Sequence, residues 1–167
     1  MSGSDGLSGM KNMLIKLLRD DYRLSDVKII REYPARIKDD PLEKPCIAIG
    51  VDSAEMKASM GGYIGANAGG GLNGQILSVT MRLDIFSPAL KPFDPYAIMD
   101  IICDILMLSP QGPRFTRVWG DGIAYDKAAE ANRLTVRAVT KMAMTAEDKS
   151  PVVSAFRLER QETAVMK

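Results

Sequence analysis

The feature that most constrains the fold is a strict alternation in residues 75–86, "QILSVTMRLDIF". Every second position is aliphatic and the positions between are mostly polar; the aliphatic set is Leu77, Val79, Met81, Leu83 and Ile85. Successive side chains of a β-strand point to opposite faces, so a period of two predicts a strand with one buried face. This chain is therefore expected to build a sheet that is covered on one side.

A second alternating stretch runs from Arg133 to Met144. Its aliphatic face contains Leu134, Val136, Ala138, Met142 and Met144, and its other face contains Arg133, Thr135, Arg137 and Lys141. This pattern predicts a second long amphipathic strand. A solvated sheet face is the commoner explanation of the three cations, and contact with an acidic partner is the alternative.

The remaining periodicities predict two helices and shorter strands. Apolar residues at helical spacing predict an amphipathic helix over about residues 7–20. A second helix is expected after Asp94, a good N-cap, with Pro95 at its first position. Short strands are expected at about 27–32, 46–52 and 114–119, and "GDG" (Gly120 to Gly122) has the composition of a hairpin turn.

This order of elements indicates an α+β fold, in which a mixed, largely antiparallel sheet has two main helices packed on it. A chain of 167 residues suits one domain, which we place at residues 1–148. Within it we expect a long glycine-rich loop at about residues 60–75. Residues 149–167 are expected to form a C-terminal arm or an extra strand, in which Phe156 and Arg157 are candidate partner contacts.

The charge balance argues against nucleic acid or a membrane as the main partner. There are 22 basic and 21 acidic residues, so the formal net charge is +1. Such a chain has no overall field to attract polyanions. No apolar run is long enough to span a bilayer, and the N-terminal residues lack the pattern of a signal peptide.

The absence of histidine narrows the chemistry that is open to this chain. Histidine-dependent acid–base catalysis, Ser-His and Cys-His nucleophiles and the common zinc sites all need this residue. Asp121, Asp126 and Glu130 have no calcium-loop spacing. Cys46 and Cys103 lie in apolar segments and are expected to be buried free thiols. We therefore expect neither an enzyme nor a bound metal or cofactor.

The segment "GGYIGANAGGGLNG" (residues 61–74) contains seven glycines. Gly69, Gly71 and Gly74 match G-x-G-x-x-G, but a dinucleotide site needs a helix directly after these glycines, and an alternating strand follows here. A loop of this length is usually functional or disordered. Ordering of the loop between subunits would give it a role, with Tyr63, Ile64 and Asn67 as interface residues. An idle surface loop is the other explanation.

Three stretches together resemble a known family. They are "MLIKLLRDDY…VKIIREYPARI", "VTMRLDIFSPALKPFDPYAIMDIICDIL" and "WGDGIAYDKAAEANRLTVRAVTKMAM", and they span nearly the whole chain. The pattern is similar to the tail-terminator proteins of long-tailed bacteriophages, prophages and phage-tail-like bacteriocins. The resemblance implies the same architecture, a mixed sheet with helices against it and an early N-terminal helix.

The resemblance also implies a structural role in a virion tail or a phage-tail-like particle assembled in the bacterial cytoplasm. Such proteins form a ring, usually of six copies, on the head-proximal end of the tail tube. The ring stops tube polymerisation and offers a surface to the neck or collar, and to the sheath in a contractile tail. DNA would only pass through the lumen, so Arg133, Arg137 and Lys141 are expected to face protein partners. Another neck or head-completion adaptor, or a nucleotide-binding module that uses the glycine segment, are the alternatives.

Overall fold

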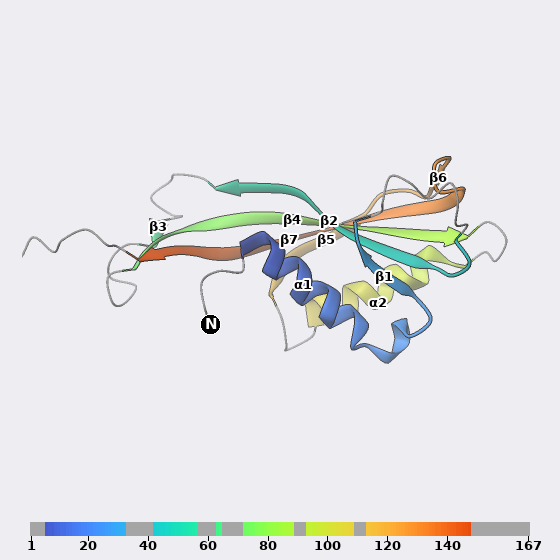
Figure 1. The fold of residues 1–167 in the computed structure, drawn as a ribbon, viewed down its shortest axis with the longest axis horizontal. Coiled ribbons are helices and arrows are strands. Elements are labelled where there is room, and N and C mark those ends of the chain that lie inside the picture. The colour runs from blue at the N-terminus through green and yellow to red at the C-terminus, as the bar shows by residue number, and fades with distance from the viewer. Residues whose placement is uncertain are drawn as a thin grey trace, which may run out of the picture.

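The computed structural model describes residues 6–32, 42–56, 63–64, 72–88, 93–108 and 113–147. Within these residues, two helices lie on one face of a seven-stranded mixed sheet, which confirms the predicted α+β class (Figure 1). The elements are α1 (Gly6–Arg19), the 3-10 turn η1 (Tyr22–Leu24), β1 (Lys28–Arg31), β2 (Cys46–Met56), β3 (Tyr63–Ile64), β4 (Leu72–Pro88), α2 (Pro95–Leu108), β5 (Phe115–Gly120), β6 (Ala124–Asp126) and β7 (Ala131–Glu147).

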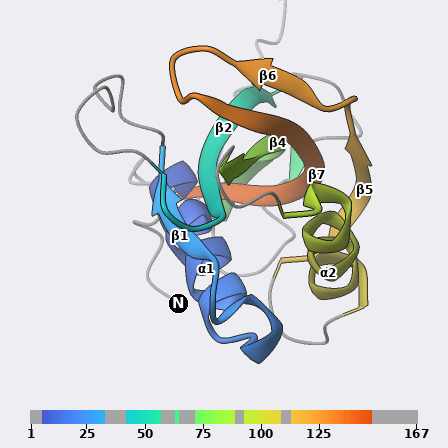
Figure 2. The same cartoon turned by 90° about the vertical axis from the view of Figure 1, so that its right-hand side faces the viewer.

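The central feature of the sheet is the pairing of β4 with β7. The strand order is β1-β2-β4-β7-β5, in which only β1 and β2 are parallel. β4 and β7 are antiparallel and stay in one register from Leu72 opposite Glu147 to Pro88 opposite Ala131. The view in Figure 2 shows the strong twist of the sheet around this pair. β3 continues the line of β2 along β4, and β6 continues the line of β5 along β7.

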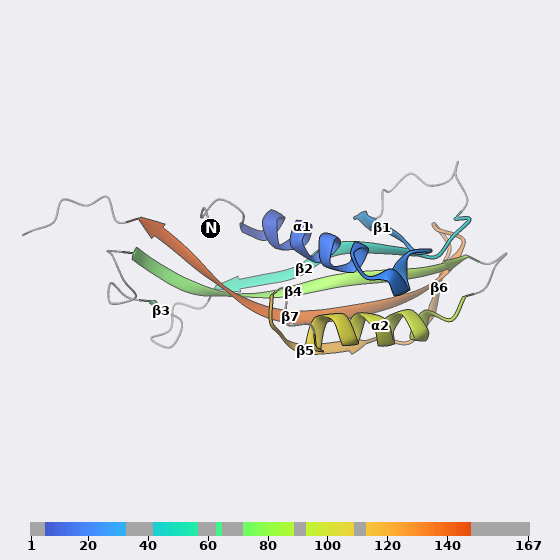
Figure 3. The ribbon, with the colours of Figure 1, turned by 90° about the horizontal axis from the view of Figure 1, so that it is seen from below.

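The core lies between the sheet and the two helices. Val79, Met81, Leu83 and Ile85 of β4 are completely buried on the face that the helices cover, as the alternation predicted. α1 contributes Leu14 and Leu18 to this core; α2 contributes Ile98 and Ile102. Figure 3 shows the helices side by side along the sheet. Burial of these side chains, each of which is worth about 1.5–3 kcal/mol, is the main stabilising contribution.

The opposite face of the sheet is buried only at one end. There Cys46, Ala48, Phe86, Ala129 and Ala131 form a second, smaller core. The turn after β6 folds over this end, and the Asp126 carboxylate fixes the turn by accepting hydrogen bonds from the backbone N–H groups of residues 128 and 129. The alternation of β4 therefore gives way to burial on both faces from residue 84 onward.

The start of α2 follows the prediction. The Asp94 carboxylate accepts a hydrogen bond from the backbone N–H of Tyr96 at 2.9 Å, which is the N-cap geometry. The preceding residue, Phe93, is bonded through both its N–H and its carbonyl to the Ser87 hydroxyl. The chain thus enters the helix from the end of β4 along a fixed path.

The strands differ from the predictions in two places. β2 continues to Met56 instead of ending near Asp52, because a bulge at Asp52 lets the strand pass from the body of the sheet into an exposed extension. The "GDG" sequence does not form a hairpin turn, since β5 and β6 both pair with β7 and lie end to end. A Cβ on Gly120 would lie 2.7 Å from the Met99 sulfur, so a larger residue there would require the flexible Met99 side chain to shift.

We expect Leu83→Asp to prevent folding, because it would place an unpaired charge in the fully buried layer between sheet and helices. Leu83→Ala should only lower the free energy of unfolding, by about 2–5 kcal/mol. Ser78→Asp, on the half-buried opposite face between Lys141 and Glu55, is the matched control and should fold. Denaturant titration followed by circular dichroism measures all three variants. A cooperative unfolding transition for Leu83→Asp would contradict the assigned faces of β4.

Candidate functional site

The most distinctive surface of the molecule is a projecting arm of the sheet. β4 and β7 are each 17 residues long, which corresponds to about 55 Å of strand, whereas a 14-residue helix spans about 21 Å. The helices therefore cannot cover the whole ladder, and its tip extends past them (Figures 1 and 3). We call this part the arm; it consists of Ser53–Met56 of β2, Leu72–Thr80 of β4 and Lys141–Glu147 of β7.

Two rows of side chains cross the arm from one edge to the other. On the outer face, away from the helices, Glu55 lies opposite Ser78, which lies opposite Lys141. On the inner face the corresponding row is Met56, Leu77 and Met142. Met56 is 47% exposed although it points to the same side as the core. The outer of these two rows is therefore polar and the inner row is apolar, with a methionine at each end of the inner row.

Arg133 is committed to the body of the protein. It lies on the outer face of β7, as predicted, and its guanidinium donates to the Asp126 carboxylate at 2.9 Å. The same carboxylate caps the turn between β6 and β7. This arginine holds the hairpin over the smaller core, and its partner is internal.

Arg137 joins three segments of the sheet. Its guanidinium donates to Asp121, which follows β5, and to Asp52 at the bulge of β2, the latter at 3.2 Å. The hydrogen bond with Asp121 is the main reason why the pKa of Arg137 is raised, and Asp52 contributes less. Arg137 also lies directly opposite Arg82 of β4. Like charges in that position repel each other, so the two carboxylates at Arg137 have a structural role.

The charge of Arg82 is balanced in a similar way. Its guanidinium contacts the Asp84 carboxylate at 2.9 Å, and the Thr135 hydroxyl donates to the other oxygen of that carboxylate at 2.7 Å. Asp84 and Thr135 are both buried. A buried carboxylate with two partners satisfies the requirement that buried polar groups be hydrogen-bonded.

An aromatic contact completes the outer face. Arg117 of β5 lies 4.6 Å from the centre of the Trp119 ring, within the range of a cation–π interaction. Trp119 is half-buried on this face, opposite Arg137. The sole tryptophan of the chain therefore packs on the sheet surface and does not belong to the main core.

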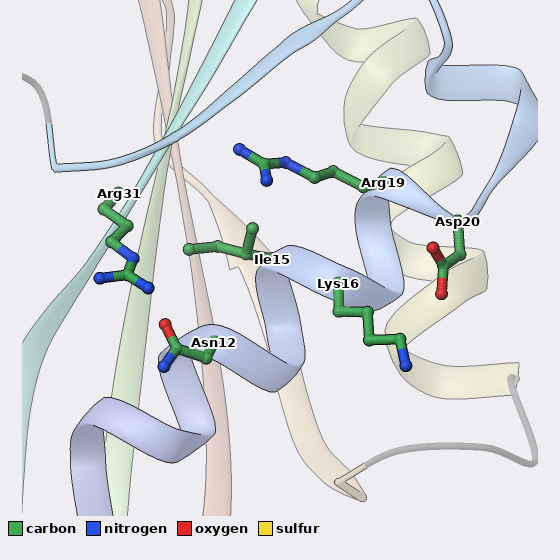
Figure 4. A pocket seen from close by; sticks show the side chains of 6 residues that line it. All are labelled: Asn12, Ile15, Lys16, Arg19, Asp20 and Arg31. Carbon is green, nitrogen blue, oxygen red and sulfur yellow. The ribbon is translucent and has the colours of Figure 1, made fainter.

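A shallow hollow of about 260 Å³ lies between α1 and β1. The residues that line it are Asn12, Ile15, Lys16, Arg19, Asp20 and Arg31, and in Figure 4 the side chains of Lys16 and Asp20 extend away from Arg31. The Arg19 guanidinium donates to the carbonyl of Ile29 in β1 at 2.8 Å. Cations near the last turn of a helix also stabilise its negative end. The described contacts therefore give this cluster a structural role at the edge of the sheet.

The glycine segment contains short strands where the structure describes it. Tyr63 and Ile64 form β3, opposite Gln75 and Gly74 of β4. Gly74 thus lies inside a strand, and the helix that a dinucleotide site requires after the third glycine is replaced by β4. The candidate interface residues Asn67, Phe156 and Arg157 lie outside the described residues.

The thiols differ in their surroundings. Cys46 is fully buried in the smaller core, and burial raises its pKa to about 11. Cys103 on α2 is free and only half-buried, less than the sequence led us to expect.

In the described parts of the chain, no three acidic or thiol groups are grouped closely enough to hold a metal ion. No helix among the described residues is long and apolar enough to cross a membrane.

Sequence reasoning found the three cations of β7 but not their partners. Asp52 and Asp121 are distant from Arg137 in sequence and meet it only through the sheet register. The arm was also missed, since its existence depends on the lengths of strands and helices together. A signal was present in "VDSAEM", where neither glycine nor proline ends the predicted strand.

A scan against protein-family models and a search of curated proteins found no match for this chain.

We expect Arg137→Ala to lower the free energy of unfolding by about 1 kcal/mol, because it removes the two partly exposed ion pairs of Arg137 with Asp52 and Asp121. Lys141→Ala, the control on the same face of β7, should change stability by less than about 0.5 kcal/mol. Urea denaturation of the two variants is the measurement. Equal stabilities would show that the Arg137 network does not hold the sheet together.

The raised pKa of Cys46 predicts very slow alkylation. At pH 8 to 9 the native protein should react with iodoacetamide at Cys103 and leave Cys46 unmodified, because the Cys46 thiol is buried and un-ionised. A thiol whose pKa is raised by folding favours the native state below its unfolded pKa. That contribution should be lost as the pH rises toward 11. Mass spectrometry of the alkylated protein, native and in urea, tests this; rapid native labelling of Cys46 would contradict it.

Proposed function

We propose that this protein is a structural component of a phage tail or phage-tail-like particle. In this role it forms a ring on the head-proximal end of the tail tube. The ring ends polymerisation of the tube and joins the tail to the neck or collar. The proposal combines the sequence resemblance with the geometry of the arm and the outer face.

The observation that most directly supports this proposal is the arm. The inner face of the arm is covered at its base, where Val79 and Leu77 belong to the main core, whereas at the β2 edge the cover is incomplete. Met56 is nearly half exposed there, although the pattern of the strand places it on the apolar face. Met56 and the half-buried Met142 lie on this face at opposite edges of a projecting, regular element, which suits contact with another protein.

The pairing of the charged residues agrees with protein partners. Arg82, Arg133 and Arg137 each contact a carboxylate of the same chain. A face of this kind presents no excess of unpaired cations to a polyanion, so DNA in the lumen of the ring would not be held by it. This argument supports contacts with the tube protein, the neck or collar protein and, in a contractile tail, the sheath.

Termination follows from complementarity. A ring in which each copy contacts the next through two different surfaces closes on itself. If one side of this ring matches the last ring of the tube and the other side differs from it, the next tube subunit finds no contact. The protein needs no chemical step to end growth.

We expect the purified chain to form closed rings and to block elongation when it is added to polymerising tube subunits of the same particle. Tube length in negative-stain images should fall as the ratio of the chain to tube subunits rises, with ring density at one end. An unrelated protein of similar size, added at the same ratios, is the control.

Other outcomes separate the alternatives. Rings that leave tube elongation unchanged would favour a neck or head-completion adaptor. A monomer whose melting temperature rises by several degrees with sub-millimolar dinucleotide or nucleoside phosphate would favour a nucleotide-binding module instead.

A further inference from the structure

We infer that the two edges of the arm bind each other between copies, so that Ser53–Met56 of one copy pairs as a strand with Lys141–Glu147 of the next. This inference deepens the proposed function by naming the surface through which the ring closes. It rests on the directions of backbone groups, on the side-chain rows of the arm and on a contrast with another edge of the sheet.

The backbone of β7 directs hydrogen-bonding groups out of the arm. The Thr135 carbonyl accepts from the N–H of Asp121, and the Val139 carbonyl accepts from the Thr116 hydroxyl. Odd-numbered residues of β7 therefore face the β5 side. The pairing of β5 begins at Thr140, so beyond it Lys141 and Ala143 face a side that no described strand occupies. Their N–H and carbonyl groups point to the side on which an added strand would pair.

The same reasoning applies to β2 on the other edge. The N–H of Lys28 in β1 donates to the Pro45 carbonyl, so odd-numbered residues before the bulge face β1. The bulge at Asp52 shifts the register by one residue, after which Glu55 faces Ser78 of β4. Ala54 and Met56 then direct their backbone groups outward, where no described strand pairs with them.

The side-chain rows make the two edges complementary. The outer row begins with the Glu55 carboxylate at one edge and ends with the Lys141 ammonium at the other. When copies stand side by side, the lysine of one copy lies next to the glutamate of its neighbour. The inner row likewise brings Met142 beside the neighbour's Met56. Opposite charges and matched apolar groups across a strand pair are stabilising.

The strand directions determine the symmetry. β2 and β7 both run toward the tip of the arm, since both are antiparallel to β4. Arms that point the same way therefore join through a parallel β7–β2 pair, which uses two different edges. Such a contact is heterologous and repeats around an axis until the ring closes.

Another edge of the same sheet is blunted. At β1, the Ile29 carbonyl points away from β2, and the Arg19 guanidinium donates a hydrogen bond to it. This acceptor is therefore already bonded within the chain. Natural sheets protect edges in this way against unwanted pairing. Ala54 of β2 and Ala143 of β7 instead direct their backbone groups outward from the arm, and this contrast favours the arm as the pairing edge.

Two alanines offer a matched pair of variants. Ala54 and Ala143 are both exposed, and each directs its N–H outward from one edge. Proline at either position removes only that outward donor and is tolerated on an edge strand. We expect Ala54→Pro and Ala143→Pro each to be monomeric in analytical ultracentrifugation, while the wild-type chain and the Ala54→Thr and Ala143→Thr controls assemble. Circular dichroism and cooperative unfolding check that each variant is folded.

Mixing the two proline variants provides the decisive measurement. Each retains one intact edge, and the two intact edges are complementary, so an equimolar mixture should form a complex of two chains and nothing larger. Self-association of either variant alone would indicate pairing of identical edges and would overturn the inference. A mixture that remains monomeric would overturn it too, as would a wild-type chain that does not associate.

A charge exchange keeps the test valid if a proline variant fails to fold. Lys141→Glu alone and Glu55→Lys alone should each weaken association at least tenfold, and the double variant should restore it. No recovery in the double variant would overturn the pairing of these two residues.

If the wild-type chain forms rings that both proline variants also form, this inference fails and the proposed function stands. If wild-type rings form but do not cap tubes, the proposed function fails and the edge pairing stands.

Discussion

The structure depends on one continuous antiparallel ladder. β4 and β7 are joined without a register shift over their full length; β2, β3, β5 and β6 each pair with one of these two strands, and β1 joins the sheet through β2. A shift of one residue would move the whole aliphatic set to the solvent side, so the buried layer and the register fix each other. The helices add the layer that the inner face needs, but they cover only part of its length. The arm is the consequence of this difference in length.

The outer face is stabilised by ion pairs instead of by a second layer. Arg137 connects β7 with the bulge of β2 and with the segment after β5, while Arg133 holds the β6–β7 hairpin. These contacts neutralise cations that would otherwise repel each other across the β4–β7 pair. They also explain why a face that the sequence marks as basic is nearly balanced in charge. Only at the end covered by the β6–β7 turn does apolar packing replace them.

Much of the fold could be predicted from the sequence, because its strongest signals are local. The alternations of β4 and β7, the period of α1 and the Asp94 cap of α2 each lie within a short stretch of chain. The length of β2, the bulge at Asp52 and the collinear arrangement of β5 and β6 depend on register between distant segments. The candidate site likewise has features that local sequence signals predict and features that depend on contacts between distant segments. The faces of Arg133, Arg137 and Lys141 were predicted correctly, whereas the partners of the arginines and the arm required the structure.

The uninterrupted ladder also has a mechanical consequence. The hydrogen bonds between antiparallel strands lie perpendicular to the strands. When β4 is held and β7 is pulled along the arm, all the bonds between them are loaded in shear at once, so they resist together instead of opening one after another. A force applied perpendicular to the strands at the tip would break the hydrogen bonds between β4 and β7 one after another, and a smaller force would suffice. The mechanical resistance of the β4–β7 pair is therefore high along the strands and low perpendicular to them.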